Sequence, residues 1–388
     1  MSVTVETQTL PLSQSLPELN LTTPSDRRAD IDAKHARLIT LLQEIQCEGL
    51  MLLQPESFGW MTSGGAARGI LDLNEHPVLY FNAEGRWVLS SNVDSQRLFD
   101  EEVDGLGFQL KEWPWHWGRS QLLADLCQGR TVATDAPLLD CKLVANQLLH
   151  LRRKLTSYEQ ACYRALGQII SHALEACCRT VQQGETEREV AGQLSHRLLH
   201  RGAQPLVIQV AADDRLRAYR HCGYTAAPVR NHCVLSVAAR KYGLCATASR
   251  SVCFGEPAPQ IRKDHDAACK VSATYVANSW PDAVPKHILS LGRRVYLVSG
   301  AEHEWLMSPQ GHVTGRQPVE LPFTPQTEDL FQSGWAVTWR ASVGTGLSCD
   351  TFLITEDGPR TITATESWPL KRIRITGAEF VRPDLLLR

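Results

Sequence analysis

Residues 234–257, VLSVAARKYGLCATASRSVCFGEP, contain two stretches of small and apolar residues on either side of Tyr242-Gly243. Apolar runs bounded by a glycine-containing turn predict two β-strands joined as a hairpin. One arginine, Arg250, lies toward the far end of the second run. The stretch therefore predicts a hairpin that carries a single positive charge among small side chains.

This hairpin resembles the central hairpin of the creatinase/aminopeptidase P family, whose fold is called the pita-bread fold. Aligned without gaps, the arginine and two glycines of the family pattern fall on Arg250, Gly243 and Gly255. The two aspartates that hold metal in the peptidases fall on Ser236 and Thr247. The resemblance thus implies the family's fold together with a change in its metal chemistry.

A second stretch, residues 151–190, is similar to the same family. The residues that match its pattern in order and spacing are Leu151, Arg152, Lys154, Glu159, Arg164, Gly184, Thr186, Glu187 and Val190. Ser157 with Gln160, and Thr186 with Glu189, each have the spacing of a capping box. They predict one helix from Ser157 to about residue 180 and a second that ends at Gly202.

The region before residue 151 alternates predicted helices and strands. Helical spacing of apolar residues covers 26–47, a buried strand covers 50–53, a hairpin covers 77–90, a helix covers 92–103 and a strand covers 131–134. The strand and turn at 50–65 also resemble the opening of the creatinase amino-terminal domain. Such alternation predicts a small α/β domain.

A chain of 388 residues exceeds what one hydrophobic core usually serves, so we expect two domains. We predict a disordered tail over 1–26, a creatinase-like α/β domain over 27–150 and a pita-bread α+β domain over 151–388. Within the last of these, the sequence predicts a helix at 264–279 and strands at 206–210, 294–298, 335–339 and 351–355.

Composition excludes several classes of function. A net charge of −2 and a pI near 6.7 provide no field for nucleic acid or an anionic membrane, and no apolar run is long enough to span a bilayer. The twelve cysteines form no C-x-x-C, which argues against a zinc knuckle or a thioredoxin-like pair. Scattered cysteines of this kind behave as small hydrophobes, which favours a reducing cytoplasm.

The resemblance implies a dinuclear metal site built from two Asp, one His and two Glu. In this chain the corresponding positions hold Ser236 and Thr247 for the aspartates, Ser308 and Pro309 in the histidine stretch, and Arg340 and Cys349 for the glutamates. Divalent cations prefer carboxylate oxygens, hydroxyls are weak neutral ligands, and a guanidinium repels cations. We therefore expect no dinuclear site and no cofactor.

A softer mononuclear site is a second interpretation of the same region. His221, Cys245, Cys349 and His312 are residue types that bind zinc. Their spacing matches no known ligand pattern, so no metal ligand is assigned from it.

His221 is the candidate catalytic residue. The resemblance places it just before the hairpin, where creatinase uses a histidine as proton carrier without metal; the alternative is a hydrogen-bonded residue lining a vestigial cleft. Cys349 is a weaker candidate, as a nucleophile. The candidate substrate-binding residues are Arg250, His312, Arg340 and Asp350.

Two of these residues have other interpretations. Arg250 is structural or substrate-orienting, because an always-protonated guanidinium cannot act as a base. Arg340 can instead fill the space of the lost ions and neutralise an acid such as Asp350.

Three functions remain open from the sequence. The first is metal-independent hydrolysis of a C–N bond in a small guanidino, amide or dipeptide-like molecule. The second is binding of a peptide or protein by a non-catalytic descendant of the peptidase fold. The third, a metal-dependent Xaa-Pro aminopeptidase, rests on the family label alone. The resemblance also implies a homodimer, and the aromatic run 113–117, WPWHW, is either packed between domains or part of a binding groove or subunit interface.

Overall fold

The computed structural model describes residues 24–68, 76–138 and 140–388. The predicted tail, 1–26, lies outside these residues except for its last three, which begin helix α1. The chain divides into two compact units. The amino-terminal unit holds the described residues up to Cys162 together with Tyr242–Leu244, and the carboxy-terminal unit holds Tyr163–Lys241 and Cys245–Arg388.

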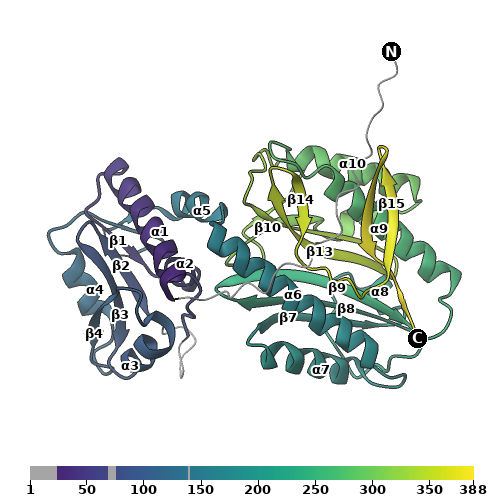
Figure 1. Ribbon diagram of the computed structural model, residues 1–388, viewed down its shortest axis with the longest axis horizontal. Helices are drawn as coiled ribbons and strands as arrows, with labels where there is room; N and C mark the ends of the chain where they lie inside the picture. Colours follow the sequence, from purple (N-terminus) through teal and green to yellow (C-terminus); the bar gives the residue numbers. More distant parts are fainter. Residues whose placement is uncertain (1–23, 69–75, 139) are drawn as a thin grey trace, which may run out of the picture. The chain divides into compact units, whose positions relative to one another are not determined.

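The amino-terminal unit is a mixed sheet flanked by helices (Figure 1). Its strands run in the order β4-β3-β2-β1-β5-β6, and β1 pairs antiparallel with β2 and parallel with β5. The strands are β1 Gly49–Leu52, β2 Val78–Asn82, β3 Gly85–Ser91, β4 Gln109–Trp113, β5 Val132–Thr134 and β6 Lys142–Leu143. The helices are α1 Pro24–Glu44, α2 Pro55–Met61, α3 Ser95–Leu98, the π-helix η1 Phe99–Val103, α4 Ser120–Cys127 and α5 Ala145–Arg153.

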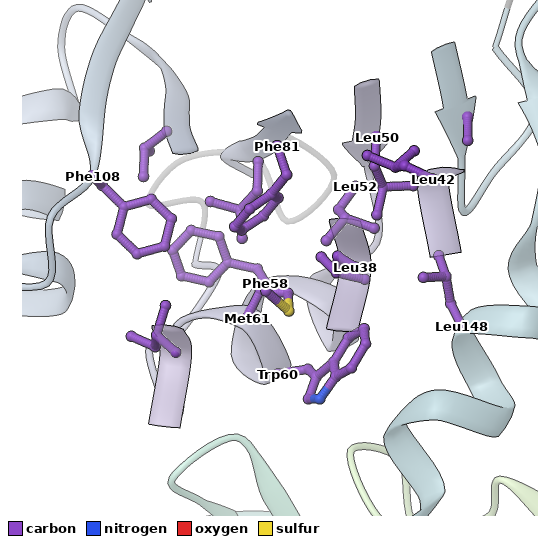
Figure 2. Packing of buried hydrophobic residues seen from close by; sticks show 14 of the residues in the cluster. Leu38, Leu42, Leu50, Leu52, Phe58, Trp60, Met61, Phe81, Phe108 and Leu148 are labelled. Atoms are coloured by element: carbon purple, nitrogen blue, oxygen red, sulfur yellow. The ribbon is translucent and has the colours of Figure 1, made fainter. Parts of the chain in front are cut away.

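Apolar side chains from α1, α2 and the sheet form the core of this unit. Figure 2 shows Leu38 and Leu42 of α1, Phe58 of α2, and Leu50 and Phe81 of the sheet within one cluster. All four residues of β1 are buried, as expected for a central strand covered on both faces. The predicted α/β alternation of this region is present.

The carboxy-terminal unit contains a four-stranded and a five-stranded sheet, plus a two-stranded ribbon (Figure 1). Their strand orders are β17-β9-β8-β7, β11-β10-β12-β13-β14 and β15-β16. The strands are β7 Gln204–Ala212, β8 His232–Lys241, β9 Leu244–Cys253, β10 Gly311–Thr314, β11 Leu321–Pro322, β12 Ala336–Val343, β13 Gly346–Thr355, β14 Gly358–Thr361, β15 Leu370–Ile375, β16 Ala378–Pro383 and β17 Leu386–Leu387.

Helices α7 and α9 pack against these sheets. Helix α7 contacts β7, whereas α9 contacts β12, β13 and α10. The helices are α6 Ser157–Thr180, α7 Glu187–His200, α8 Arg215–Ala218, α9 Pro259–Ala277, α10 Pro285–Val298 and the 3-10 helix η2 Glu302–Met307. No helix in the described part of the chain has the length and apolarity needed to cross a membrane.

The capping predictions had mixed outcomes. The Thr186–Glu189 capping box is present at the start of α7. At α6 the box is shifted by one residue, because the Glu159 amide donates to Thr156 Oγ1 at 3.2 Å and the Thr156 amide donates to Glu159 Oε2 at 2.9 Å. The prediction of Ser157 with Gln160 is therefore wrong, since Ser157 is already the first helical residue.

The predicted strand at 294–298 is also wrong. These residues are the last turn of α10, whose buried positions include Ile288, Gly292 and Tyr296, four residues apart. A short apolar run is compatible with either a strand or a helix, and here the helical spacing of apolar residues begins before residue 294.

Candidate functional site

The hairpin β8–β9 has the geometry that its sequence predicts. Tyr242 and Gly243, the two residues between the strands, have φ values of 56° and 65°, as in a two-residue type I′ turn. A Cβ on residue 243 would lie 3.0 Å from the carbonyl oxygen of Gly59. Glycine is therefore required at this position, both by conformation and by space.

The hairpin β12–β13 brings two of the aligned metal positions face to face. Its register pairs Arg340 with Cys349 and Trp339 with Asp350. Neighbouring residues of a strand point to opposite faces, so Arg340 and Cys349 share one face of the sheet, and Asp350 projects from the other.

Arg340 is the centre of a polar cluster. Its guanidinium donates to Ser236 Oγ at 3.4 Å, to Gln209 Oε1 at 3.0 Å and to the carbonyl oxygen of Arg220 at 3.0 Å. Ser236 holds the first aligned aspartate position, and Cys349 opposite Arg340 holds the second glutamate position. The structure thus brings together residues that are 104 positions apart in the chain.

His221 lies directly after one of these acceptors. Its Nε2 is 3.0 Å from Ser308 Oγ, at an aligned histidine position. Partial burial, followed by the positive charge of Arg340, lowers the pKa of His221. The imidazole is consequently neutral at pH 7, and its hydrogen bond to a hydroxyl fixes the ring beside Arg340.

His312 belongs to the same neighbourhood. His312 on β10 pairs with Thr338 on β12. Thr338 stands two residues before Arg340 and therefore lies on the same face of the sheet. Burial and the nearby Arg340 lower the pKa of His312 to about 4. In the described part of the chain, His312 Nε2 and Arg340 Nε are buried without a hydrogen-bond partner.

Cys349 has the environment of a structural thiol. The side chain is buried, and this burial raises its pKa to about 11. The thiolate, which is the nucleophilic form, is therefore scarce at neutral pH. This chemistry argues against Cys349 as a nucleophile.

Arg250 and Asp350 lie in a separate ion-pair network. Arg250 contacts Asp350 Oδ1 at 3.0 Å and Glu175 Oε1 at 3.4 Å, and Arg382 also pairs with Asp350. Asp350 therefore takes its counter-charges from Arg250 and Arg382, and the expectation that Arg340 neutralises it is wrong.

The side chains at the aligned ligand positions do not fit a pair of divalent cations. Ser236 offers a neutral hydroxyl, Cys349 a protonated thiol and Arg340 a positive charge. Thr247 has its backbone N–H and C=O bound to Thr351 Oγ1, both at 2.9 Å. Among residues 24–68, 76–138 and 140–388, no group of three or more His, Cys, Asp or Glu side chains is placed to hold a metal ion. The alternative of a softer mononuclear site finds no support in this arrangement.

Comparison with known proteins identifies the family. The model of metallopeptidase family M24 matches residues 161–355, about half of the chain. The chain belongs to family M24. This membership confirms the resemblance drawn from the hairpin and from residues 151–190. None of the curated proteins with which the M24 chain was compared matches it.

Solved structures confirm the fold of this M24 protein. The prolidase from Pyrococcus horikoshii OT3 is 15% identical with a TM-score of 0.72, covering 88% of this chain and 99% of its own. The Xaa-Pro dipeptidase from Bacillus anthracis is 17% identical with a TM-score of 0.72, covering 92% and 100%. The N-terminal domain of the FACT complex subunit SPT16 from Cicer arietinum is 11% identical with a TM-score of 0.64, covering 88% and 96%. Identities this low show the fold alone, and they bear out the predicted α+β pita-bread architecture.

Sequence reasoning missed the residues that hold Arg340. Gln209 interrupts the apolar run Leu206–Val210, and this polar residue in a predicted strand was the available signal. The carbonyl of Arg220 gives no sequence signal, because a backbone acceptor depends only on how the chain is folded.

Proposed function

We propose that this chain is a metal-independent M24 protein that binds a peptide or small molecule bearing a carboxylate at the polar cluster around Arg340 in its carboxy-terminal unit. The observation that carries the proposal is the position of Arg340. Its guanidinium stands at an aligned glutamate position, hydrogen-bonded to Ser236 at an aligned aspartate position. A positive charge at this point favours an anion where the peptidases bind cations.

The environment of Arg340 supports an anionic ligand. The three groups that accept its hydrogen bonds are a hydroxyl, an amide and a backbone carbonyl, all uncharged. The side chain is 9% exposed, and burying a charge is costly unless a counter-charge accompanies it. A carboxylate would supply that charge and form a charge-assisted hydrogen bond.

The names of the similar structures suggest the ligand class. The Pyrococcus horikoshii protein is a prolidase, and the Bacillus anthracis protein is by name an Xaa-Pro dipeptidase, which acts on dipeptides. The Cicer arietinum domain belongs, by name, to a subunit of a complex. A short peptide with a free carboxyl terminus is the ligand we propose for the polar cluster around Arg340.

The binding test compares dipeptides that have a free carboxyl terminus with their carboxyl amides by calorimetry. We expect the acids to bind and the amides to bind about tenfold more weakly. Arg340→Met should weaken binding of the acids by a similar factor, because one charge-assisted hydrogen bond is removed. Arg360→Met is the matched control, since Arg360 is exposed and pairs with Asp357 on the surface. Equal affinity of acids and amides would contradict the proposal.

The metal test restores the family's ligand types at the aligned positions. Protein purified without chelator should hold well under one divalent ion per chain, as measured by elemental analysis. The combined variant Ser236→Asp, Thr247→Asp, Ser308→His, Arg340→Glu and Cys349→Glu should gain manganese, cobalt or zinc binding, because it restores hard anionic ligands. Tightly held metal in the unmodified protein would refute metal independence.

A second candidate function rests on the contact between His221 and Ser308. A neutral histidine at 3.0 Å from a hydroxyl can carry a proton in metal-independent hydrolysis of a C–N bond. A screen of creatine-like, amide and Xaa-Pro compounds tests this function. Turnover abolished by His221→Ala would favour the hydrolase, and turnover unchanged by it would remove this histidine from the mechanism.

A further inference from the structure

Two cysteines of the amino-terminal unit lie against each other. Cys127 is the last residue of α4, and Cys141 immediately precedes β6. Their sulfur atoms are 3.4 Å apart, although the two residues are 14 positions apart in the chain. A disulfide bond is about 2.05 Å long, so side-chain rotations that bring the sulfurs about 1.4 Å closer are enough to form one.

Exposure to solvent distinguishes this pair from the other cysteines. All twelve cysteines of the chain lie in its described residues, and ten of them are buried. The two that are only half-buried are Cys127 and Cys141. A thiol reacts with a dissolved reagent only where the reagent can reach its sulfur. The two cysteines that an oxidant can reach are therefore the two that contact each other.

The chain between the two cysteines is connected to the centre of the amino-terminal unit. It carries β5, which pairs with the buried strand β1. Asp135, directly after β5, accepts hydrogen bonds from the backbone amides of Leu53 at 2.7 Å and Gln54 at 3.2 Å, just before α2. A covalent bond between the cysteines would close this part of the chain into a loop and reduce the conformational freedom of its unfolded state.

We propose that Cys127 and Cys141 form a reversible disulfide bond when a low-molecular-weight disulfide such as oxidised glutathione accumulates, and that this bond stabilises the amino-terminal unit. In a reducing environment the pair stays as two thiols. The proposal makes this pair a redox-sensitive modification site. It goes beyond the function proposed for the polar cluster around Arg340 and does not depend on it.

The reaction is a pair of thiol–disulfide exchanges. The thiolate of Cys127 attacks one sulfur of the small disulfide, whose S–S bond breaks, and one small thiol leaves after taking up a proton. The thiolate of Cys141 then attacks the sulfur of Cys127, which forms the protein disulfide and releases the second small thiol. The protein loses two electrons and two protons, and the small disulfide gains both. Burial and the contact with Cys127 raise the pKa of Cys141 to about 11, which is consistent with Cys141 reacting second.

The test incubates the full chain in mixtures of oxidised and reduced glutathione and then measures its free thiols in denaturant and its intact mass. As the mixture becomes more oxidising, two of the twelve thiols should disappear, with a mass loss of two hydrogens. A proteolytic digest should yield peptides joined through Cys127 and Cys141, and dithiothreitol should separate them.

Single substitutions identify the cysteines involved. Cys127→Ser and Cys141→Ser should each prevent the cross-link. Cys47→Ala is the matched control, because it removes a buried cysteine of the same unit and should leave the cross-link unchanged. Twelve free thiols in every mixture, a cross-link that persists in Cys127→Ser, or glutathione retained on either cysteine of the unmodified chain without a cross-link would overturn the proposed disulfide.

Hydrogen exchange followed by mass spectrometry tests the effect of the bond. Peptides that cover β5 should exchange more slowly after oxidation, by up to about 100-fold, because closing a loop of this length disfavours the unfolded state. Peptides from α7 in the carboxy-terminal unit should exchange at the same rate before and after oxidation. Exchange of β5 that oxidation leaves unchanged would overturn the stabilising role of the bond.

Discussion

The two faces of the hairpin β12–β13 differ in how their charged side chains are partnered. On one face, Asp350 keeps ion pairs with Arg250 and Arg382, and Arg250 also contacts Glu175. On the other face, Arg340 and Cys349 occupy aligned glutamate positions, and the acceptors of Arg340 are neutral. Adjacent residues of one strand, Cys349 and Asp350, therefore belong to different chemical environments.

The difference separates a buried network of paired charges from a buried arginine whose hydrogen-bond acceptors are neutral. Arg250, Asp350 and Glu175 are almost fully buried and mutually compensated, so removing one member leaves the others as uncompensated charges. No equivalent constraint applies to Arg340, because its hydrogen-bond acceptors are neutral and its removal leaves no uncompensated charge on them. We therefore expect substitutions to cost more stability on the face that carries Asp350 than on the face that carries Arg340.

The largest expected effect comes from disrupting the ion-pair network around Asp350. Arg250→Met should lower the free energy of unfolding by about 3–5 kcal/mol, because Asp350 and Glu175 lose a buried counter-charge. Denaturant unfolding followed by circular dichroism measures this change. A loss below about 1 kcal/mol, the level of an exposed ion pair such as Arg360–Asp357, would contradict the structural role of Arg250.

His265 and His312 should contribute to the free energy of unfolding with opposite pH dependence. Burial opposes protonation of His265, yet its contacts with Cys269 and Asp384 outweigh burial and raise its pKa to about 9. Its stabilising contribution is then full below pH 6.5, the ordinary histidine pKa, and is lost as pH rises through about 9. His265 lines a small recess together with Arg250 and Asp350.

His312 on the other face should act in the reverse direction. Because burial and Arg340 lower its pKa to about 4, the unfolded chain takes up the proton first, and stability falls as pH drops from 6.5 toward 4. Each slope is at most about 1.4 kcal/mol per pH unit. Urea unfolding across this range should show the acid slope reduced by His312→Asn and the alkaline slope reduced by His265→Gln. An acid slope that His312→Asn leaves unchanged would refute the lowered pKa of His312.

The smallest effect should come from Arg340→Met, the same type of substitution on the face that carries Arg340 and Cys349. Arg340→Met should change the free energy of unfolding by no more than about 1 kcal/mol in either direction, since lost hydrogen bonds are offset by removal of a buried charge. Comparison with Arg250→Met under identical conditions is the control. Equal losses for the two variants would remove the distinction between the faces.

Much of the fold was predictable from local sequence. The hairpin around Tyr242-Gly243 and the capping box at Thr186 follow from turn and capping chemistry that acts over a few residues. The prediction of a strand at the end of α10 is wrong because a short apolar run suits both a strand and a helix. The shift of the α6 cap to Thr156 reflects a competition between two adjacent, chemically similar candidates.

For the candidate site, the sequence determined which residue types occupy the aligned positions, namely Ser236, Arg340 and Cys349, because residue identity is fixed before folding. It also determined the period-two alternation that separates Cys349 from Asp350. Only the tertiary structure decided that Arg340 meets Gln209 and the carbonyl of Arg220, and that Asp350 pairs with Arg250 and Arg382. These contacts join segments distant in sequence, and their partners depend on strand register and packing, which no local pattern encodes.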